Sequence, residues 1–315
     1  MLNRRRFVQS IVAAATTPSL LHGCATAPES TARPAGLSAR PEGLLDLADG
    51  LNLRVISKMG RRMSDGLTVP GGHDGMAAFP GPDGRILLVR NHELGYKLRP
   101  DTAMGRKYPE LPWRLKSEFY DLGNMETPGP GGTTTTLYNP VTQEVEKQFL
   151  SLAGTELNCA GGPTPWGSWL SCEECFENVG EQNLHDIPFV REKNHGYVFE
   201  VPAAATGPVN PVPLKAMGRF EHEAAAVHKP TGIVYMTEDR HHSLFYRFIP
   251  ATPGQLAKGG KLQALALAGQ KAFVTHNWGG GQNMPAHESL DTRWVTLNDV
   301  DPVENDLRLR GAVRG

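Results

Sequence analysis

The segment with the most chemical potential runs from Asn158 to Glu174. In it the thiol of Cys159 precedes a stretch rich in glycine and proline, and a short apolar run then ends in the acidic pair Glu173-Glu174. Glycine lets a backbone approach an ion closely, and a soft thiolate beside hard carboxylates suits iron together with a harder cation such as calcium. Alone, each feature is more typical of a small buried cysteine or of solvated acids. Together they favour a metal site.

The same construction recurs along the chain. A turn glycine, a short apolar strand and an acidic pair form both Gly167–Glu174 and Gly232–Asp239, and a looser copy runs from Gly84 to Glu93. The copies lie further apart than the blades of a typical propeller, so loop insertions or intervening blades are needed. A radial β-propeller places equivalent residues of successive blades around one channel. The repeat therefore predicts a cluster of carboxylates.

Further candidates flank these copies. The segment Arg219–Glu223 adds up to two carboxylates, and spacing alone does not decide whether Glu221 or Glu223 faces inward. The His73-Asp74-Gly75 segment is a candidate ligand loop, although a plain turn is the commoner explanation. Arg90 and Arg240 adjoin acidic strand ends and are candidates to orient a phosphate, although arginine there is more often solvated or ion-paired.

The composition predicts an all-β protein. The 315 residues include 35 Gly and 25 Pro, which interrupt the chain too often for long helices, and the apolar runs are short and rich in aromatic and branched side chains. A hairpin is expected between Thr133 and Leu152, with its turn at Asn139-Pro140. The predicted strands are 85–90, 133–138, 145–152, 168–171, 197–201, 233–236, 244–248 and 294–297.

The amino terminus predicts export. Arg4-Arg5-Arg6-Phe7 precedes an uncharged stretch that is too short and too interrupted for a membrane span, so residues 1–25 read as a twin-arginine signal peptide. Cys24 follows Leu-His-Gly, which resembles a lipobox, with soluble release in the periplasm as the alternative. Residues 26–42 are expected to be a flexible tether, and residues 43–315 the folded propeller domain.

Charge and cysteine content narrow the class further. The formal net charge is −1, so nothing points to nucleic acid, and membrane contact is expected only through a lipid on Cys24. Three cysteines remain in the body, so they cannot all pair internally. Cys172 and Cys175 are candidates for a disulfide in an oxidising compartment, and their CxxC spacing alone is weak evidence for zinc.

These segments together resemble the PhoX-type alkaline phosphatases. The resemblance rests on the run from Asn158 to Glu174, on Arg90–Glu93, on Gly218–Ala225 and on Tyr235–Arg240, and it extends over most of residues 43–302. It implies a six-bladed propeller that hydrolyses phosphate monoesters with trivalent iron and calcium. By position it implies Cys159 as the iron ligand, and it makes metal ligands of Glu93, Glu173, Glu223, Glu238 and Asp239.

The resemblance also implies a phosphate contact for Asn91, beside the basic candidates Arg90 and Arg240. We expect a monomer that is exported by the twin-arginine translocation machinery and acts on a small phosphomonoester in the periplasm. There is no Ser-His-Asp order and no GxSxG elbow, so the expected nucleophile is an oxygen activated by metal, either a bound water or an oxo species.

One departure bears on activity. In the family an Arg-x-Glu segment with a phosphate contact and a metal carboxylate follows the region that matches Trp294–Arg310, and the given sequence stops at Gly315 before it. The chain is then either a fragment or a shortened homologue with an unfinished last blade and an open edge. The alternatives are a calcium-dependent propeller hydrolase of lactones or phosphotriesters, which does not need Cys159, and a non-catalytic propeller.

Overall fold

The computed structural model describes residues 37–39, 45–96, 101–103, 117–184, 187–270, 273–276, 284–285 and 287–314. The chain divides into two compact units, Met1–Arg54 and Val55–Gly315. In the first unit β1 (Leu37–Ala39) pairs antiparallel with β2 (Asp46–Ala48). The signal peptide, Cys24 and most of the tether lie outside the described residues.

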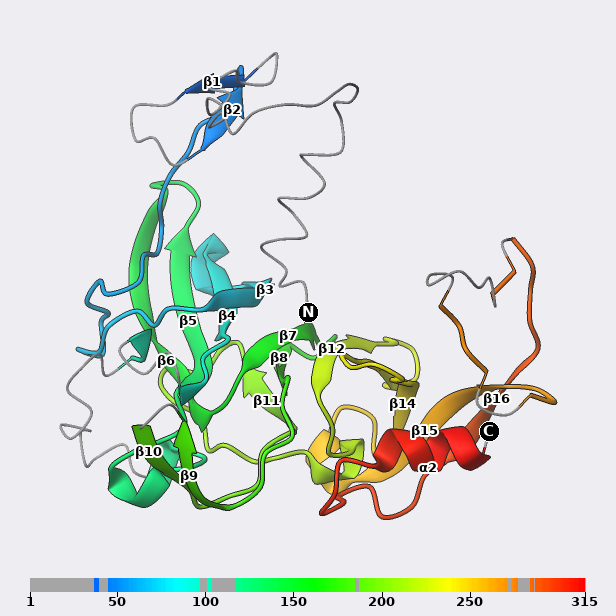
Figure 1. Ribbon diagram of the computed structural model, residues 1–315. Coiled ribbons are helices and arrows are strands. Elements are labelled where there is room, and N and C mark those ends of the chain that lie inside the picture. Colours follow the sequence, from blue (N-terminus) through cyan, green and yellow to red (C-terminus); the bar gives the residue numbers. More distant parts are fainter. Residues whose placement is uncertain are drawn as a thin grey trace, which may run out of the picture. The chain divides into compact units, whose positions relative to one another are not determined.

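The second unit is built from antiparallel sheets (Figure 1). The first sheet has the order β3-β4-β5-β6, the second β11-β8-β7, and the third β12-β13-β14-β15-β16. Their strands are β3 (His73–Pro80), β4 (Ile86–His92), β5 (Gly131–Asn139), β6 (Glu144–Thr155), β7 (Asn158–Pro163), β8 (Ser168–Glu173), β11 (Val198–Pro202), β12 (His222–Val227), β13 (Val234–Glu238), β14 (Phe245–Pro250), β15 (Gly260–Leu267) and β16 (Thr292–Thr296).

The remaining elements lie between or after these sheets. A separate hairpin joins β9 (Gly180–Leu184) to β10 (Ile187–Arg191), and the helix α2 (Leu307–Arg314) follows the third sheet. Short 3₁₀ turns are η1 (Pro82–Gly84), η5 (Gly123–Met125), η6 (Lys215–Met217) and η7 (Leu256–Lys258). Within the described residues, no helix combines the length and apolar character that crossing a membrane requires.

The three sheets follow one another as propeller blades do. Their first strands lie together, with β7 between β3 and β12, and each sheet then runs outward as an antiparallel meander (Figure 1). The all-β, propeller-like prediction is confirmed. In the described part of the chain there are three such blades rather than six, and their strands do not close into a ring.

Apolar side chains fill the two spaces between the blades. Leu87 and Val89 of the first sheet pack with Trp169 and Phe199 of the second, and Leu170 on the other face of the second packs in a separate core with strands β13–β15. Because strand residues alternate between faces, the second blade contributes one set of side chains to each core. The blades are thus held edge to edge at their first strands and face to face further out.

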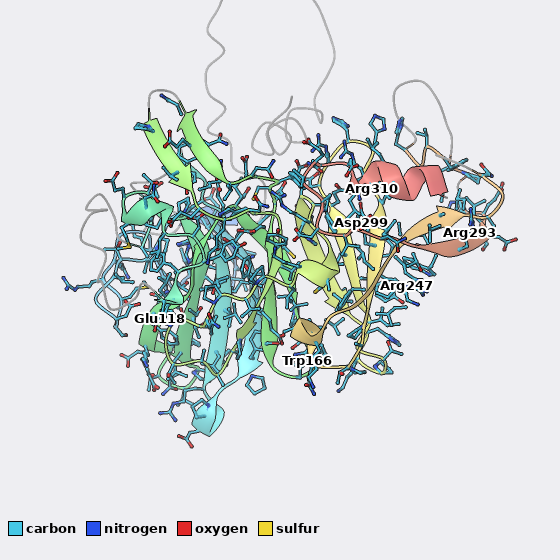
Figure 2. The ribbon with its side chains drawn as sticks, turned by 90° about the horizontal axis from the view of Figure 1, so that it is seen from below. Glu118, Trp166, Arg247, Arg293, Asp299 and Arg310 are labelled. Carbon is cyan, nitrogen blue, oxygen red and sulfur yellow. The ribbon has the colours of Figure 1, made fainter. Side chains whose placement is uncertain are left out.

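The far face of the third sheet carries different side chains. Arg247 lies there, with its guanidinium 4.2 Å from the centre of the Trp294 ring (Figure 2). In the second blade, Trp166 in the turn before β8 donates a hydrogen bond from its indole Nε1 to Glu200 Oε1, at 2.6 Å. The third sheet therefore ends in an arginine-capped aromatic face rather than in a further apolar core.

The glycine-rich stretch after Cys159 is a strand, whereas the sequence predicted a turn. β7 lies so close to its neighbours that a Cβ on Gly161 would stand 1.8 Å from Leu170 O, and one on Gly162 would stand 1.8 Å from Ala225 O. Glycine is needed here because the strands of two blades approach closely. The eight strands predicted from sequence are all present, as is the β5–β6 hairpin.

Candidate metal centre

Each blade begins with the same irregularity in its first strand. The pairing register shifts between His73 and Met76 in β3, between Asn158 and Gly161 in β7, and between His222 and Ala225 in β12. Such bulges put an extra residue into one strand and redirect its side chain. The residues that open the three bulges are Asp74, Cys159 and Glu223.

The second strands end in an equally regular way. The ladder pairs before the bulges are His73 with His92, Asn158 with Glu173, and His222 with Glu238. The residue that directly follows each second strand donates its backbone N–H to a carbonyl of the first strand's segment, two residues before the residue that opens the bulge. These bonds join Glu93 to Gly72 at 2.7 Å, Glu174 to Leu157 at 2.9 Å, and Asp239 to Glu221 at 3.2 Å.

Five of these six side chains form a cluster around Cys159. Ligand atoms of Asp74, Glu93 and Cys159 lie within 4.8 Å of one another, as do those of Cys159, Glu174 and Glu223. The thiol sulfur is 3.8 Å from Asp74 Oδ1 and 3.6 Å from Glu223 Oε2. We call these five residues, together with Asp239, the ligand cluster.

The electrostatics of the ligand cluster favour the binding of a cation. Burial and, to a smaller extent, the carboxylates of Glu223, Glu93 and Asp239 raise the pKa of Glu174 to about 7, against a hydrogen bond with the Cys159 thiol that lowers it. Burial and the neighbouring acids also raise the pKa of Cys159 strongly. Carboxylates crowded in this way are stabilised by a cation, and oxygen donors with one sulfur make a metal-binding set.

Glu173 lies outside the ligand cluster. Its Oε1 accepts hydrogen bonds from Glu156 N at 2.9 Å and His195 Nδ1 at 2.7 Å, and its Oε2 accepts from the N–H groups of Gly196 and Tyr197 at 2.8 and 3.0 Å. It is fully buried and faces the first blade. The acid of this pair that reaches the cluster is Glu174, which takes the place expected for Glu173.

Glu238 is the equivalent of Glu173 in the third blade. It is buried, and its Oε2 accepts hydrogen bonds from Tyr246 Oη at 2.9 Å and Leu244 N at 3.4 Å. Its Oε1 has no hydrogen-bond partner among the described residues. Glu238 is therefore not one of the clustered ligands, and its neighbour Asp239 is the carboxylate that helps to raise the pKa of Glu174.

Asn91 has no capacity left for a phosphate. Its Nδ2 donates to the carbonyls of Cys159 at 3.1 Å and Ala160 at 2.7 Å, and its Oδ1 accepts from Trp169 Nε1 and Ser171 Oγ, both at 2.8 Å. The side chain is fully buried. The expected phosphate contact is replaced by a structural contact to the Cys159 bulge.

The two basic candidates have other partners. Arg90 donates from Nη2 to Ser57 Oγ at 3.0 Å, its Nε is buried without a partner among the described residues, and burial lowers its pKa to about 10. Arg240 pairs with Glu221 at 2.8 Å near the surface. Neither belongs to the ligand cluster.

Asp74 and Glu174 are the members of the cluster that sequence reasoning did not select. A signal for Asp74 exists in the triplets His73-Asp74-Gly75, Asn158-Cys159-Ala160 and His222-Glu223-Ala224. In each, a polar residue precedes the ligand and a small residue follows it. Cys172 and Cys175, candidates for a disulfide, are both buried free thiols.

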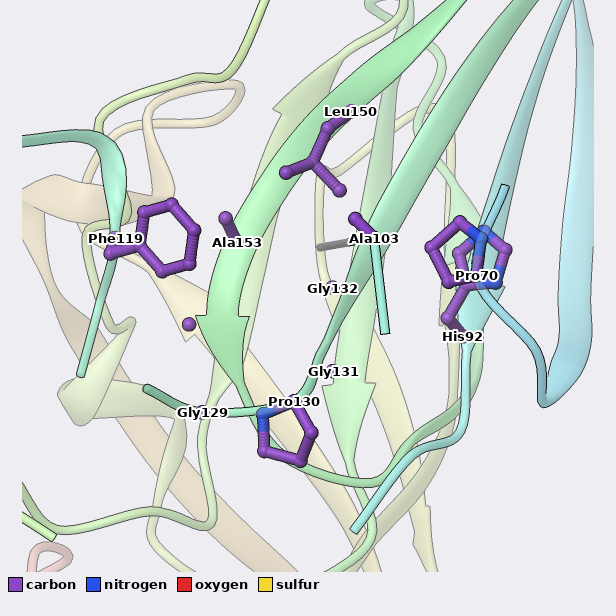
Figure 3. Close-up of a pocket in the computed structure, with 11 residues that line it drawn as sticks. Pro70, His92, Ala103, Phe119, Gly129, Pro130, Gly131, Gly132, Leu150 and Ala153 are labelled. Carbon is purple, nitrogen blue, oxygen red and sulfur yellow. The ribbon is translucent and has the colours of Figure 1, made fainter. Parts of the chain in front are cut away.

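A small cavity lies apart from this centre (Figure 3). It lies behind His92 and is lined by Pro70, Phe119 and the backbone of Gly129–Gly132, with a volume of about 10 Å³. That is room for a single water molecule at most. None of the ligand cluster lines it, so it is a packing defect and not a substrate site.

Comparisons with known proteins found one family and one solved structure that are similar to this chain. A family described as "Alkaline phosphatase PhoX" matches residues 33–109 and 120–313. No curated protein is similar to the chain at a significant level. A solved structure of Pseudomonas fluorescens PhoX in complex with vanadate, a transition state analogue, is 20% identical with a TM-score of 0.41, covering 64% of this chain and 46% of that one. The chain thus spans less than half the length of that protein. Because the family match extends over most of its residues, the chain belongs to the PhoX alkaline phosphatase family.

Proposed function

We propose that the ligand cluster binds metal ions and that the chain hydrolyses phosphate monoesters there. The observation that carries this proposal is the convergence of five ligand side chains from equivalent positions of three blades. Membership in the PhoX family supports the reaction class.

The donor set fits iron together with calcium. Cys159 supplies one soft donor, whereas Asp74, Glu93, Glu174 and Glu223 supply hard oxygens. Such cations, when bound, neutralise phosphate oxygens and activate water for attack on phosphorus. The protein holds five acids close together, and the bound cations offset the electrostatic repulsion between them. The Cys159 thiol loses its proton when a cation binds.

The rigidity of the three bulges serves this role. Each ligand is followed or preceded by a residue in a β-ladder, and five of the six residues in the adjoining ladder pairs are buried, His73 being the exposed one. Ligands on strands keep their geometry better than ligands on loops do.

The proposal is tested by the turnover of p-nitrophenyl phosphate by metal-loaded protein. Cys159→Ser and Glu223→Gln are expected to lower kcat/KM by at least about a hundredfold, because each removes a ligand. Glu146→Gln, which alters an exposed ion pair with Arg85 at 3.2 Å, is the control and is expected to keep the activity. Turnover of lactones or phosphotriesters that survives Cys159→Ser would instead support the calcium-dependent hydrolase.

We further propose that the twin-arginine leader exports the folded, metal-loaded chain to the periplasm, with a lipid on Cys24 as its anchor. The supporting observations are Arg4-Arg5 and the lipobox-like Leu-His-Gly-Cys24. Replacing Arg4 and Arg5 with Lys should retain the protein in the cytoplasm, and Cys24→Ser should release it from membranes. Export that is unaffected by the Lys variant would refute this route.

A further inference from the structure

Asn91 links the first blade to the Cys159 bulge of the second. It lies near the end of β4, and its amide reaches the carbonyls of Cys159 and Ala160 on β7 while it also accepts hydrogen bonds from two side chains of β8. All four hydrogen-bonding positions of the amide are used, and the side chain is fully buried. A buried amide this fully satisfied holds one position.

The chemistry of its partners fixes which way the amide points. The indole N–H of Trp169 can only donate, so it faces Oδ1, and the two carbonyls can only accept, so they face Nδ2. Ser171 donates to the same oxygen and itself accepts a hydrogen bond from Asn158 Nδ2 at 2.9 Å. Buried hydrogen bonds thus hold Asn158, which precedes Cys159, as well as the carbonyls of Cys159 and of Ala160, which follows it.

The two carbonyls that Asn91 holds belong to the residues of the bulge. The pairing register of β7 with β8 shifts between Asn158 and Gly161, so Cys159 and Ala160 are the residues at which the strand departs from regular geometry. On the other side, a Cβ on Gly75 would stand 2.8 Å from Ala160 Cα, so β3 presses against the same two residues. Asn91 donates hydrogen bonds to both backbone carbonyls of this bulge.

We propose that Asn91 is the positioning residue of the ligand cluster: by holding both carbonyls of the bulge it directs the Cys159 thiol toward Asp74 and Glu223. The inference rests on the proposed function only in taking Cys159 as a metal ligand. Its structural part concerns the protein without metal, and the two parts are tested separately.

The metal-free test measures how fast iodoacetamide alkylates each cysteine of the intact chain, resolved by mass spectrometry. Asn91→Asp keeps the shape but sets a carboxyl against two carbonyls, so Cys159, fully buried in the native protein, is expected to react at least about tenfold faster. Cys172 and Cys175, also buried, should keep their native rates and so report that the fold is intact.

Two further variants make the test specific. Thr133→Val is the matched control, because it removes a buried hydrogen bond to Ser151 in the same first sheet, at 2.8 Å, without touching the bulge. If Asn91→Asp does not fold, Trp169→Phe removes one of the two donors to Oδ1 and should give a smaller acceleration at Cys159 alone. A native alkylation rate at Cys159, or equal acceleration at all three cysteines, would overturn the proposal.

Cobalt(II) tests the metal-dependent part. A thiolate-to-cobalt absorption band is expected in the native protein and in Thr133→Val, and it should weaken in Asn91→Asp together with at least about a tenfold loss of cobalt affinity. Absence of the band in the native protein would count against Cys159 as a ligand, and so against the proposed function, while the alkylation result would still decide the role of Asn91. An unchanged band and affinity in Asn91→Asp would overturn the positioning role.

Discussion

Glu173 and Glu174 are adjacent in the chain, but Glu173 is held in a buried hydrogen-bond network whereas Glu174 belongs to the ligand cluster. Glu173 is the last residue of β8 and is enclosed by four hydrogen bonds, two of them from the backbone of Gly196 and Tyr197. Glu174 points the other way, into the ligand cluster. Alternation along the strand separates an acid that stabilises the fold from an acid that is available to a metal.

This separation predicts opposite effects for two conservative substitutions. Glu173→Gln should lower the free energy of unfolding by about 3–5 kcal/mol, because it leaves buried donors around His195 poorly matched. Glu174→Gln should leave stability without metal unchanged or raise it, since its burial among like charges disfavours the ionised form, and should reduce bound metal. Urea unfolding and elemental analysis measure both. Loss of metal in Glu173→Gln at native stability would reverse the assignment.

His195 predicts a pH dependence of stability. Burial lowers its pKa, but Glu173 and Asp121, at 2.7 and 3.2 Å from its two ring nitrogens, outweigh this and raise the pKa to about 10. The folded protein therefore keeps a proton that the unfolded chain loses above pH 6.5. Stability should fall as pH rises from about 7 to 10, by up to about 1.4 kcal/mol per pH unit.

The matched variant for this prediction is His195→Gln, which cannot bind the extra proton. Urea unfolding at several pH values, with both proteins free of metal, should show a lower stability at neutral pH and a slope that is shallower by about one proton. Parallel curves for the two proteins would show that His195 is neutral in the fold.

The close approach of β7 to β12 predicts the effect of a single methyl group. In Gly162→Ala the new Cβ would meet the Ala225 carbonyl, so the second and third blades must separate, and Cys159 would move away from Glu223. We expect a loss of at least about 1–3 kcal/mol together with reduced metal binding. Gly207→Ala is the control, since a Cβ there has no atom within 4 Å. Equal melting temperatures for the two variants would contradict this packing.

Replacing the guanidinium of Arg219, which binds carbonyl groups, is expected to lower the free energy of unfolding substantially. Arg219 is fully buried and donates to the carbonyls of His195, Pro302 and Glu177, and its guanidinium carbon lies 3.9 Å from the centre of the Phe176 ring. A lysine cannot span three carbonyls, so Arg219→Lys should cost about 3 kcal/mol or more in urea unfolding. Arg85→Lys, at an exposed ion pair, should change little. Similar costs in both variants would show that the buried contacts are dispensable.

Sequence patterns predicted the strands well because alternation and glycine punctuation are local. The three acidic repeats correspond to β4, β8 and β13, the second strands of consecutive blades, so the long spacing between copies comes from insertions. The repeat also predicts that acids from distant parts of the chain lie around one centre.

What the sequence could not provide is which residue of each pair turns inward. The bulges at Asp74, Cys159 and Glu223 shift the register by contacts between strands, and no local propensity encodes that shift. The resemblance implies a phosphate contact for Asn91, and local sequence gives no sign of its actual partners, which lie 68 to 80 residues further along the chain on another blade.

The central claim, that the ligand cluster is a metal centre, is tested most directly by elemental analysis of the purified protein prepared without chelator. The account predicts bound iron and calcium in the native chain, with iron lost in Cys159→Ser and retained in Thr133→Val. A native chain without bound metal, or a Cys159→Ser variant with the native metal content, would contradict it.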